Sequence, residues 1–158
     1  MDNIDSLRHH LVNLLTKAEA HVDARAELKD FPAKLRGAKP KGAPHTPWQL
    51  LEHMRLAQWD ILRFSLDPKH KSPKFPEGYW PKTDAPPSDA AWQGSVKMFL
   101  ADLDEMCTLV NDKKRDLFSP IPHGQGQSLL REALLVADHN AYHLGQLVLL
   151  RRTLEAVK

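Results

Sequence analysis

The sequence predicts an all-α protein, a four-helix bundle with long connections, on three observations. The 158 residues suit one domain, which we expect to span residues 1–158. All twelve prolines fall within residues 32–47, 68–87 and 120–122, and a proline inside a helix costs about 3 kcal/mol or more. No stretch shows the alternation typical of a strand. The four proline-free stretches are therefore expected to be helices, joined by links longer than the ~2–8 residues usual in a bundle.

The first two helices are predicted from their apolar stripes and starting residues. The second begins at Pro47, where Thr46 can cap the helix and Gln49 completes a capping box, and it runs to about Leu66. The first covers residues 5–29, and its stripe at helical spacing consists of Leu7, Leu11, Leu14, Leu15 and Ala18.

The last two helices follow the second and third groups of prolines. Ser88 is the expected cap of the third helix, whose apolar stripe runs from Val96 to Val110. The fourth is predicted from about Ser128 to Ala156, with Arg151 near its C-terminal end, where the helix dipole favours cations.

The link over residues 67–87 is unusually aromatic. It contains Phe75, Tyr79 and Trp80, so we expect it to pack on the bundle rather than extend into solvent.

Gly145 weakens the fourth helix by about 1 kcal/mol relative to alanine. We interpret this glycine as making room for another backbone segment, such as the loop around Tyr79.

Composition and charge limit the class of protein. Hydrophobic residues make up 42% and the formal net charge is +2, which favours a globular enzyme or binding protein over a nucleic-acid-binding one. The longest aliphatic run, residues 147–150, is far shorter than the ~20 residues of a membrane span. Because the sequence opens with an acidic segment, we expect no signal peptide. We therefore expect a cytoplasmic protein with no membrane or nucleic-acid partner.

The cysteine content excludes another class of site. Cys107 is the only cysteine, so the chain has neither an internal disulfide nor a multi-cysteine zinc site. Because Cys107 falls on the stripe of the third helix, we expect a buried, inert thiol rather than a nucleophile.

Three of the nine histidines point to a metal site. His139 and His143 lie four residues apart, on one face of the fourth helix. Such a pair is weak evidence, since composition alone gives about 0.5 pairs by chance. However, His53 lies on the corresponding stripe of the second helix, between Leu50 and Ala57. Burying three imidazoles without hydrogen-bond partners would cost free energy of folding. A divalent cation can take these partners' place, and a cation bound by three histidines with open coordination positions is typical of a reactive site.

The other histidine patterns in the sequence do not predict a catalytic or metal site. The His-Glu-x-x-His motif of zinc proteases is not formed, because Asn140 stands where the glutamate would act as general base. His45 is expected in the loop before the second helix rather than on a metal. Solvated or loop positions are expected for the remaining five histidines: His9, His10, His21, His70 and His123.

At these histidines the chain resembles the DinB-like (DinB/YfiT) metalloenzyme family. The similar segments are HTPWQLLEH at residues 45–53, HNAYHLGQ at 139–146 and the GYWP loop at 78–81. The resemblance implies a four-helix bundle, often a homodimer, that binds one divalent metal through His53, His139 and His143. It also implies, for some members, a reaction with a low-molecular-weight thiol, as in S-transferases and a thiol-dependent isomerase.

Three further side chains are candidates for catalytic roles. Asp60, two turns after His53, either holds a ligand or acts as a fourth one; the alternative is a surface carboxylate near Arg63. Gln146 either hydrogen-bonds a ligand or substrate or caps a polar end of the core. Tyr142 either donates to a substrate or packs with its hydroxyl in water.

The sequence therefore favours a metal-dependent enzyme acting on a small molecule, either a thiol-dependent S-transferase or a hydrolase. The metal would lower the pKa of a bound thiol or water. Zinc and nickel suit imidazole ligands best, and iron and manganese stay open. The alternative is a non-catalytic metal-binding or stress-response protein with a structural or sensing site. A third interpretation makes the histidines polar groups of the core without any metal.

Overall fold

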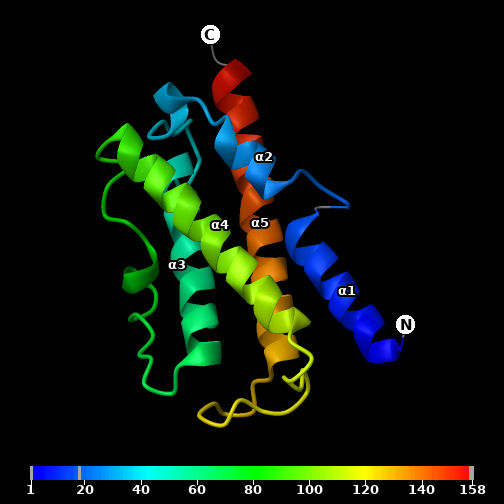
Figure 1. Cartoon of the computed structure of the whole chain (residues 1–158). Coiled ribbons are helices and arrows are strands. Elements are labelled where there is room, and N and C mark those ends of the chain that lie inside the picture. Colours follow the sequence, from blue (N-terminus) through cyan, green and yellow to red (C-terminus); the bar gives the residue numbers. More distant parts are fainter. Residues whose placement is uncertain (1, 18, 157–158) are drawn as a thin grey trace.

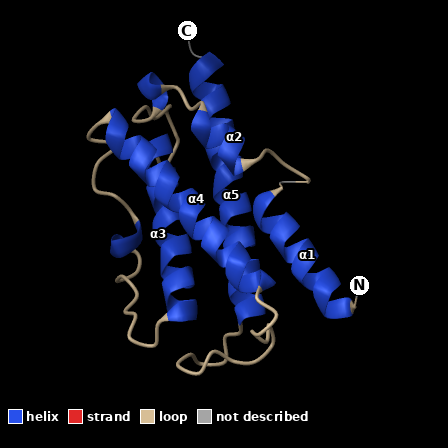
Figure 2. Cartoon of the chain, viewed as in Figure 1, coloured by secondary structure: helices blue, strands red, loops and turns tan. Residues whose placement is uncertain are grey.

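The computed structural model describes residues 2–17 and 19–156, and this part of the chain is all-helical. Figure 2 shows helices joined by loops, with no strand in the described ranges. The fold class predicted from the prolines and the apolar stripes is therefore confirmed. The elements, in chain order, are α1 (Asn3–Thr16), α2 (Ala24–Lys29), a 3₁₀ turn (Ala33–Leu35), α3 (Pro47–Leu66), a second 3₁₀ turn (Glu77–Tyr79), α4 (Asp89–Asn111) and α5 (Leu129–Ala156).

Each of the four long helices packs against at least two of the others. Helix α3 packs along both α4 and α5, and α1 packs against the same two helices (Figure 1). This is the packing expected of a four-helix bundle. Long loops join α3 to α4 and α4 to α5. Among the helices described, none combines the length and the apolar character that a bilayer span needs.

The region predicted as one helix over residues 5–29 contains two helices. Helix α1 ends at Thr16, and the short α2 starts only at Ala24. The prediction of a single helix was therefore wrong. The physical reason lies at Asp23, whose carboxylate accepts a hydrogen bond from the Arg25 backbone N–H at 2.9 Å and starts a new helix.

The predicted stripe of the first helix is only partly buried. Leu11 and Leu15 belong to an apolar cluster with residues from α3, α4 and α5, whereas Leu14 is 54% exposed. Ala18 lies outside the described residues. A second cluster lies around the α2 end of the bundle and includes Phe31 and Trp92. These two clusters form the core.

Helices α3 and α4 begin as the sequence predicts. Thr46 Oγ1 accepts from the Gln49 backbone N–H at 3.2 Å, and Gln49 Oε1 accepts from the Thr46 N–H at 3.0 Å, which completes the capping box. Ser88 Oγ accepts from the Ala91 N–H at 3.1 Å at the start of α4. These caps fix the N-terminal ends of the two helices that the aromatic loop joins.

The aromatic loop packs on the bundle at Tyr79 and Trp80 but not along its whole length. Both of these side chains are partly buried, whereas Phe75 is 77% exposed. The expectation for Phe75 was therefore wrong. The expectation for Gly145 was also wrong, because a Cβ added there would meet nothing within 4 Å.

Candidate metal centre

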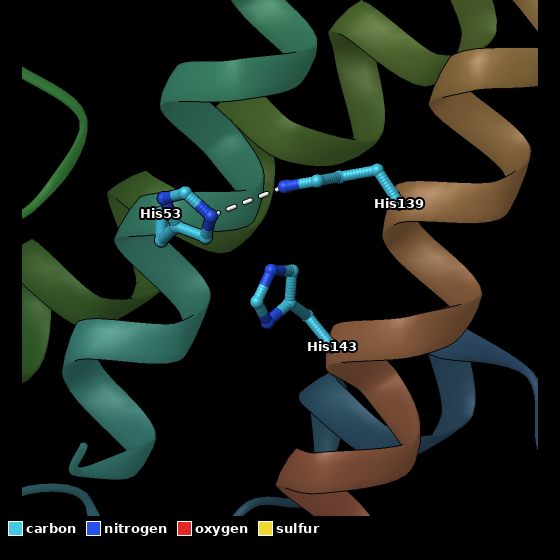
Figure 3. A group of neighbouring side chains, drawn as sticks. All are labelled: His53, His139 and His143. Carbon is cyan, nitrogen blue, oxygen red and sulfur yellow. Dashed lines mark hydrogen bonds between the residues drawn. The ribbon is translucent and has the colours of Figure 1, made fainter. Parts of the chain in front are cut away.

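Three imidazole rings from two helices converge inside the bundle. His53 extends from α3, and His139 and His143 extend from successive turns of α5, with the three rings turned toward one another (Figure 3). The Nε2 atoms of His53 and His139 lie 3.1 Å apart, and one nitrogen from each ring lies within 4.8 Å of the others. Two of the rings, His53 and His143, are 8% exposed, and His139 is half-buried. The spacing of four on α5 and the packing of α3 along α5 bring them together.

The separation of these nitrogens suits a single metal ion. Two imidazole nitrogens bound to one zinc ion at about 2.0–2.1 Å lie about 3–3.5 Å apart. The His53–His139 pair already has such a spacing at 3.1 Å. The cluster could therefore hold a metal ion after small adjustments of the ring positions.

Hydrogen bonds orient two of the rings for metal binding. His53 Nδ1 donates to the backbone carbonyl of Tyr79 at 3.0 Å, and His143 Nδ1 donates to Gln146 Oε1 at 2.8 Å. Because an oxygen acceptor holds the proton on Nδ1, the Nε2 atom of a neutral ring carries a lone pair directed toward the centre. The surroundings thus select the tautomer that a metal requires.

Burial keeps the three rings neutral near pH 7. Desolvation is the main cause that lowers the pKa of His53 and of His143 below the usual 6.5, although hydrogen bonds to Tyr79 and Gln146 oppose it. Desolvation, followed by repulsion from the other two imidazoles, lowers the pKa of His139 to about 4. A neutral imidazole is the form that ligates a metal.

Two aromatic rings that the sequence did not assign to the site cover His53. Trp80 stacks on His53 with ring centroids 3.9 Å apart and planes 3° apart. His45 stacks on the other side of Trp80, also at 3.9 Å. The aromatic content of the loop was the available signal for Trp80, but nothing local in the sequence shows that His45 would join the stack.

Asp60 is a buried carboxylate bound to the aromatic loop, and not a surface carboxylate beside Arg63. It is 9% exposed, and its two oxygens accept hydrogen bonds from His70 Nε2 at 2.6 Å and Tyr79 Oη at 2.7 Å. Arg63 instead pairs with Asp102 and Glu105. Asp60 therefore anchors the aromatic loop, whose Tyr79 carbonyl in turn holds His53.

His70 lies in the loop, which agrees with its predicted position, but its side chain is only 9% exposed there. The hydrogen bond to Asp60 accounts for this burial, because it satisfies a ring nitrogen away from water. Burial, together with the same carboxylate, raises the pKa of Tyr79 to about 12 and keeps its hydroxyl protonated.

The other two candidate side chains lie beside the cluster. Gln146 contacts His143 directly through the hydrogen bond described above. Tyr142 is 64% exposed, and its ring packs edge-on against His143 with centroids 4.8 Å apart. Gln146 thus orients a histidine, while the hydroxyl-bearing ring of Tyr142 forms part of the surface next to the site.

Asn140 and Cys107 have structural surroundings. Asn140 Nδ2 donates to Gln58 Oε1 at 2.7 Å, and Gln58 Nε2 donates to the Phe99 carbonyl at 2.6 Å, which links α5, α3 and α4. Cys107 is buried on α4, and burial raises the pKa of its thiol to about 11. Neither residue takes part in the histidine cluster.

Comparison with known proteins agrees with this fold and site. The family profile of the DinB superfamily matches residues 9–147, which is most of the chain. The matched segment includes all three histidines of the cluster. No curated protein and no solved structure matches the chain. On the extent of the family match, the chain belongs to the DinB superfamily.

Proposed function

We propose that the chain works as one domain over residues 1–158, binds one divalent metal ion through His53, His139 and His143, and is a metal-dependent enzyme acting on a small molecule. One observation carries the proposal: three neutral imidazoles from two helices lie within 4.8 Å, and two of them have their outer N–H held by an oxygen. Membership of the DinB superfamily supports it.

Zinc or nickel is the proposed ion, because both suit an all-imidazole ligand set; iron and manganese are the next choices. A divalent ion here supplies Lewis-acid chemistry that lowers the pKa of a thiol or of water. We propose a thiol-dependent S-transfer with a low-molecular-weight thiol, or a hydrolysis, as the reaction class.

The protein's own residues would orient the ligands and receive the substrate. The Tyr79 carbonyl and Gln146 keep the Nε2 atoms of His53 and His143 aimed at the centre. Trp80 covers one face of His53 and excludes water from it. Tyr142, exposed beside His143, is placed to contact a substrate that approaches from solvent.

The second candidate is a non-catalytic metal site with a structural or sensing role. The observation that favours it is the burial of His53 and His143, which are both 8% exposed. Structural metal sites are normally closed by protein ligands, whereas a catalytic site keeps a position for substrate. The two candidates therefore differ in whether a small molecule can reach the ion.

The metal site is tested by metal analysis of untagged protein. We expect about one ion per chain in the unmodified protein and a severe loss in His143→Ala, because two remaining imidazoles bind a divalent ion much more weakly. The matched control is His10→Ala, which removes an exposed imidazole from α1 and should keep the metal. Equal metal content in His143→Ala and the unmodified protein would contradict the proposal.

The reaction class is tested by a screen of thiols with electrophiles and of small esters, using metal-loaded protein. Turnover that disappears in His143→Ala supports the enzyme. A metal-loaded protein that is inactive across the whole panel supports the second candidate. A cytoplasmic location, expected from the sequence, and a homodimer, implied by the resemblance, stay predictions. Sedimentation analysis checks the homodimer against the chain mass of 18.0 kDa.

A further inference from the structure

An apolar groove lies next to the histidine cluster, on the face formed by α5 and the loop that precedes α3. Its volume is about 270 Å³, just below the range of about 300–1,000 Å³ typical of pockets for drug-sized ligands. Leu50 and Leu150 are buried residues in its lining, and Leu149 is 68% exposed at the groove. Ala43 and Pro44 line it from the loop. The groove therefore suits a small apolar molecule.

Two of its lining residues connect the groove to the histidine cluster, Gln146 directly and His45 through Trp80. Gln146 lines the groove and accepts the hydrogen bond from His143 Nδ1. His45 lines the groove and stacks on Trp80, which stacks on His53. A molecule bound in the groove is thus one side chain away from His143 and two stacked rings away from His53.

The charge at the groove favours an anion. Lys41 is the single charged side chain among the described residues that line it. It is exposed, so its ammonium group can pair with a negative group of a ligand at the groove edge. An uncharged or anionic molecule avoids the repulsion that a cation would meet there.

We propose that this groove binds the aliphatic part of a small carboxylate-bearing substrate, and so gives the substrate class of the neighbouring metal centre. The inference rests on the proposed function for the link to catalysis, but groove binding itself requires no metal ligand. The apolar lining supplies the affinity, Lys41 selects the carboxylate, and His45 and Gln146 connect the groove to the site.

Octanoate is the probe, measured by calorimetric titration of both metal-free and metal-loaded protein. We expect affinity to rise about twofold to fourfold for each methylene from butanoate to octanoate, as expected for chain burial in an open groove. Octylammonium should bind about tenfold more weakly than octanoate because of Lys41. Acetate, which has the carboxylate but no chain, reports any binding that does not involve the groove.

A pair of exposed leucines on α5 provides the matched variants. Leu149→Glu places a negative charge in the groove and should weaken octanoate binding by about tenfold or more. Leu134→Glu changes the same residue type on the same helix, where the side chain is 44% exposed outside the groove lining, and should leave binding unchanged. Circular dichroism checks that both variants fold, and metal analysis checks that both keep the ion.

The outcomes separate this inference from the proposed function. Equal octanoate affinity in Leu149→Glu and the unmodified protein, or affinity that does not depend on chain length, overturns the groove proposal. So does a dimer that Leu149→Glu dissociates, because a second copy then covers this face. Metal content measured on the same samples tests the proposed function by itself: metal-loaded protein without octanoate binding overturns only the groove, and octanoate binding by protein that takes up no metal overturns only the metal site.

Discussion

At the scale of the residue, the immediate surroundings of each titratable group decide its chemistry. His53 and His143 have an oxygen acceptor on Nδ1, which leaves Nε2 for a metal. Cys107 has the opposite surroundings: it is buried on α4, and desolvation raises the pKa of its thiol to about 11. A thiol is reactive only as the thiolate, so Cys107 is expected to be inert in the folded protein.

Alkylation by iodoacetamide measures this inertness. With a pKa of about 11, only about one thiol in a thousand is ionised at pH 8, against about one in four for a free cysteine of pKa near 8.5. Raising the pH toward 11 increases the thiolate fraction, so the rate should rise steadily over this range. We expect labelling at pH 8 to be at least about a hundredfold slower in folded protein than in urea, followed by mass spectrometry. Equal rates in the two states would contradict the buried, inert thiol.

At the scale of the element, the capping residues determine where helices begin and also where the loops attach. Thr46 caps α3 and is fully buried, and its hydroxyl donates to the Asp84 carbonyl at 2.6 Å in the loop that carries Trp80. Ser88 caps α4 with a single hydrogen bond at an exposed position. Thr46 therefore stabilises both the start of α3 and the loop, whereas Ser88 stabilises only the start of α4.

Alanine at each cap tests the difference. Thr46→Ala should lower the free energy of unfolding by about 2 kcal/mol, because it removes both the helix cap and the hydrogen bond from the buried Thr46 hydroxyl to the Asp84 carbonyl. Ser88→Ala should lower it by about 1 kcal/mol, the usual value of a cap. Urea denaturation measures both variants. A loss in Thr46→Ala no larger than in Ser88→Ala would show that the contact with Asp84 adds no stability.

At the scale of the whole molecule, the histidine cluster joins two helices that are far apart in sequence. His53 and His139 are 86 positions apart, and they meet because α3 packs along α5. A metal ion that binds the folded chain alone stabilises it in proportion to the logarithm of the free metal concentration. The proposed ion would thus fasten α3 to α5.

Metal addition and removal measure this effect. At a free zinc concentration about 100 times the Kd, the folded state should gain about 2.7 kcal/mol, or about 5–10 °C in Tm for a chain of this length. A chelator should reverse the gain, and His143→Ala should show neither effect. Scanning calorimetry measures the shift. An equal rise of Tm in the unmodified protein and in His143→Ala would contradict binding at the cluster.

Local signals predicted α3, α4 and α5 well and α1 poorly. A group of prolines precedes each of the three later helices, and Thr46 and Ser88 cap α3 and α4 through hydrogen bonds between near neighbours. Residues 17–23 contain no proline or glycine, so nothing obvious in the sequence interrupts the first helix. The cap at Asp23, an acidic residue in an otherwise helical pattern, was the signal that could have revealed the break.

The candidate site was predicted in its residues but only partly in its surroundings. Helical periodicity by itself places His139 and His143 on one face of α5 and His53 on the buried stripe of α3, because every turn of a helix repeats the same geometry. The contacts of Asp60 were not predicted, because its partners His70 and Tyr79 reach it from a loop without periodicity.

The sequence alone therefore determined the helical class, the limits of three helices and the turns that carry the three histidines, since each depends on residues a few positions apart. Only the tertiary structure decided that Trp80 and His45 stack over His53, that the Tyr79 carbonyl and Gln146 orient two of the rings, and that Asp60 anchors the loop. Except for the local contact of Gln146, these interactions join distant segments, and their geometry follows from how side chains fill the space between packed helices and loops.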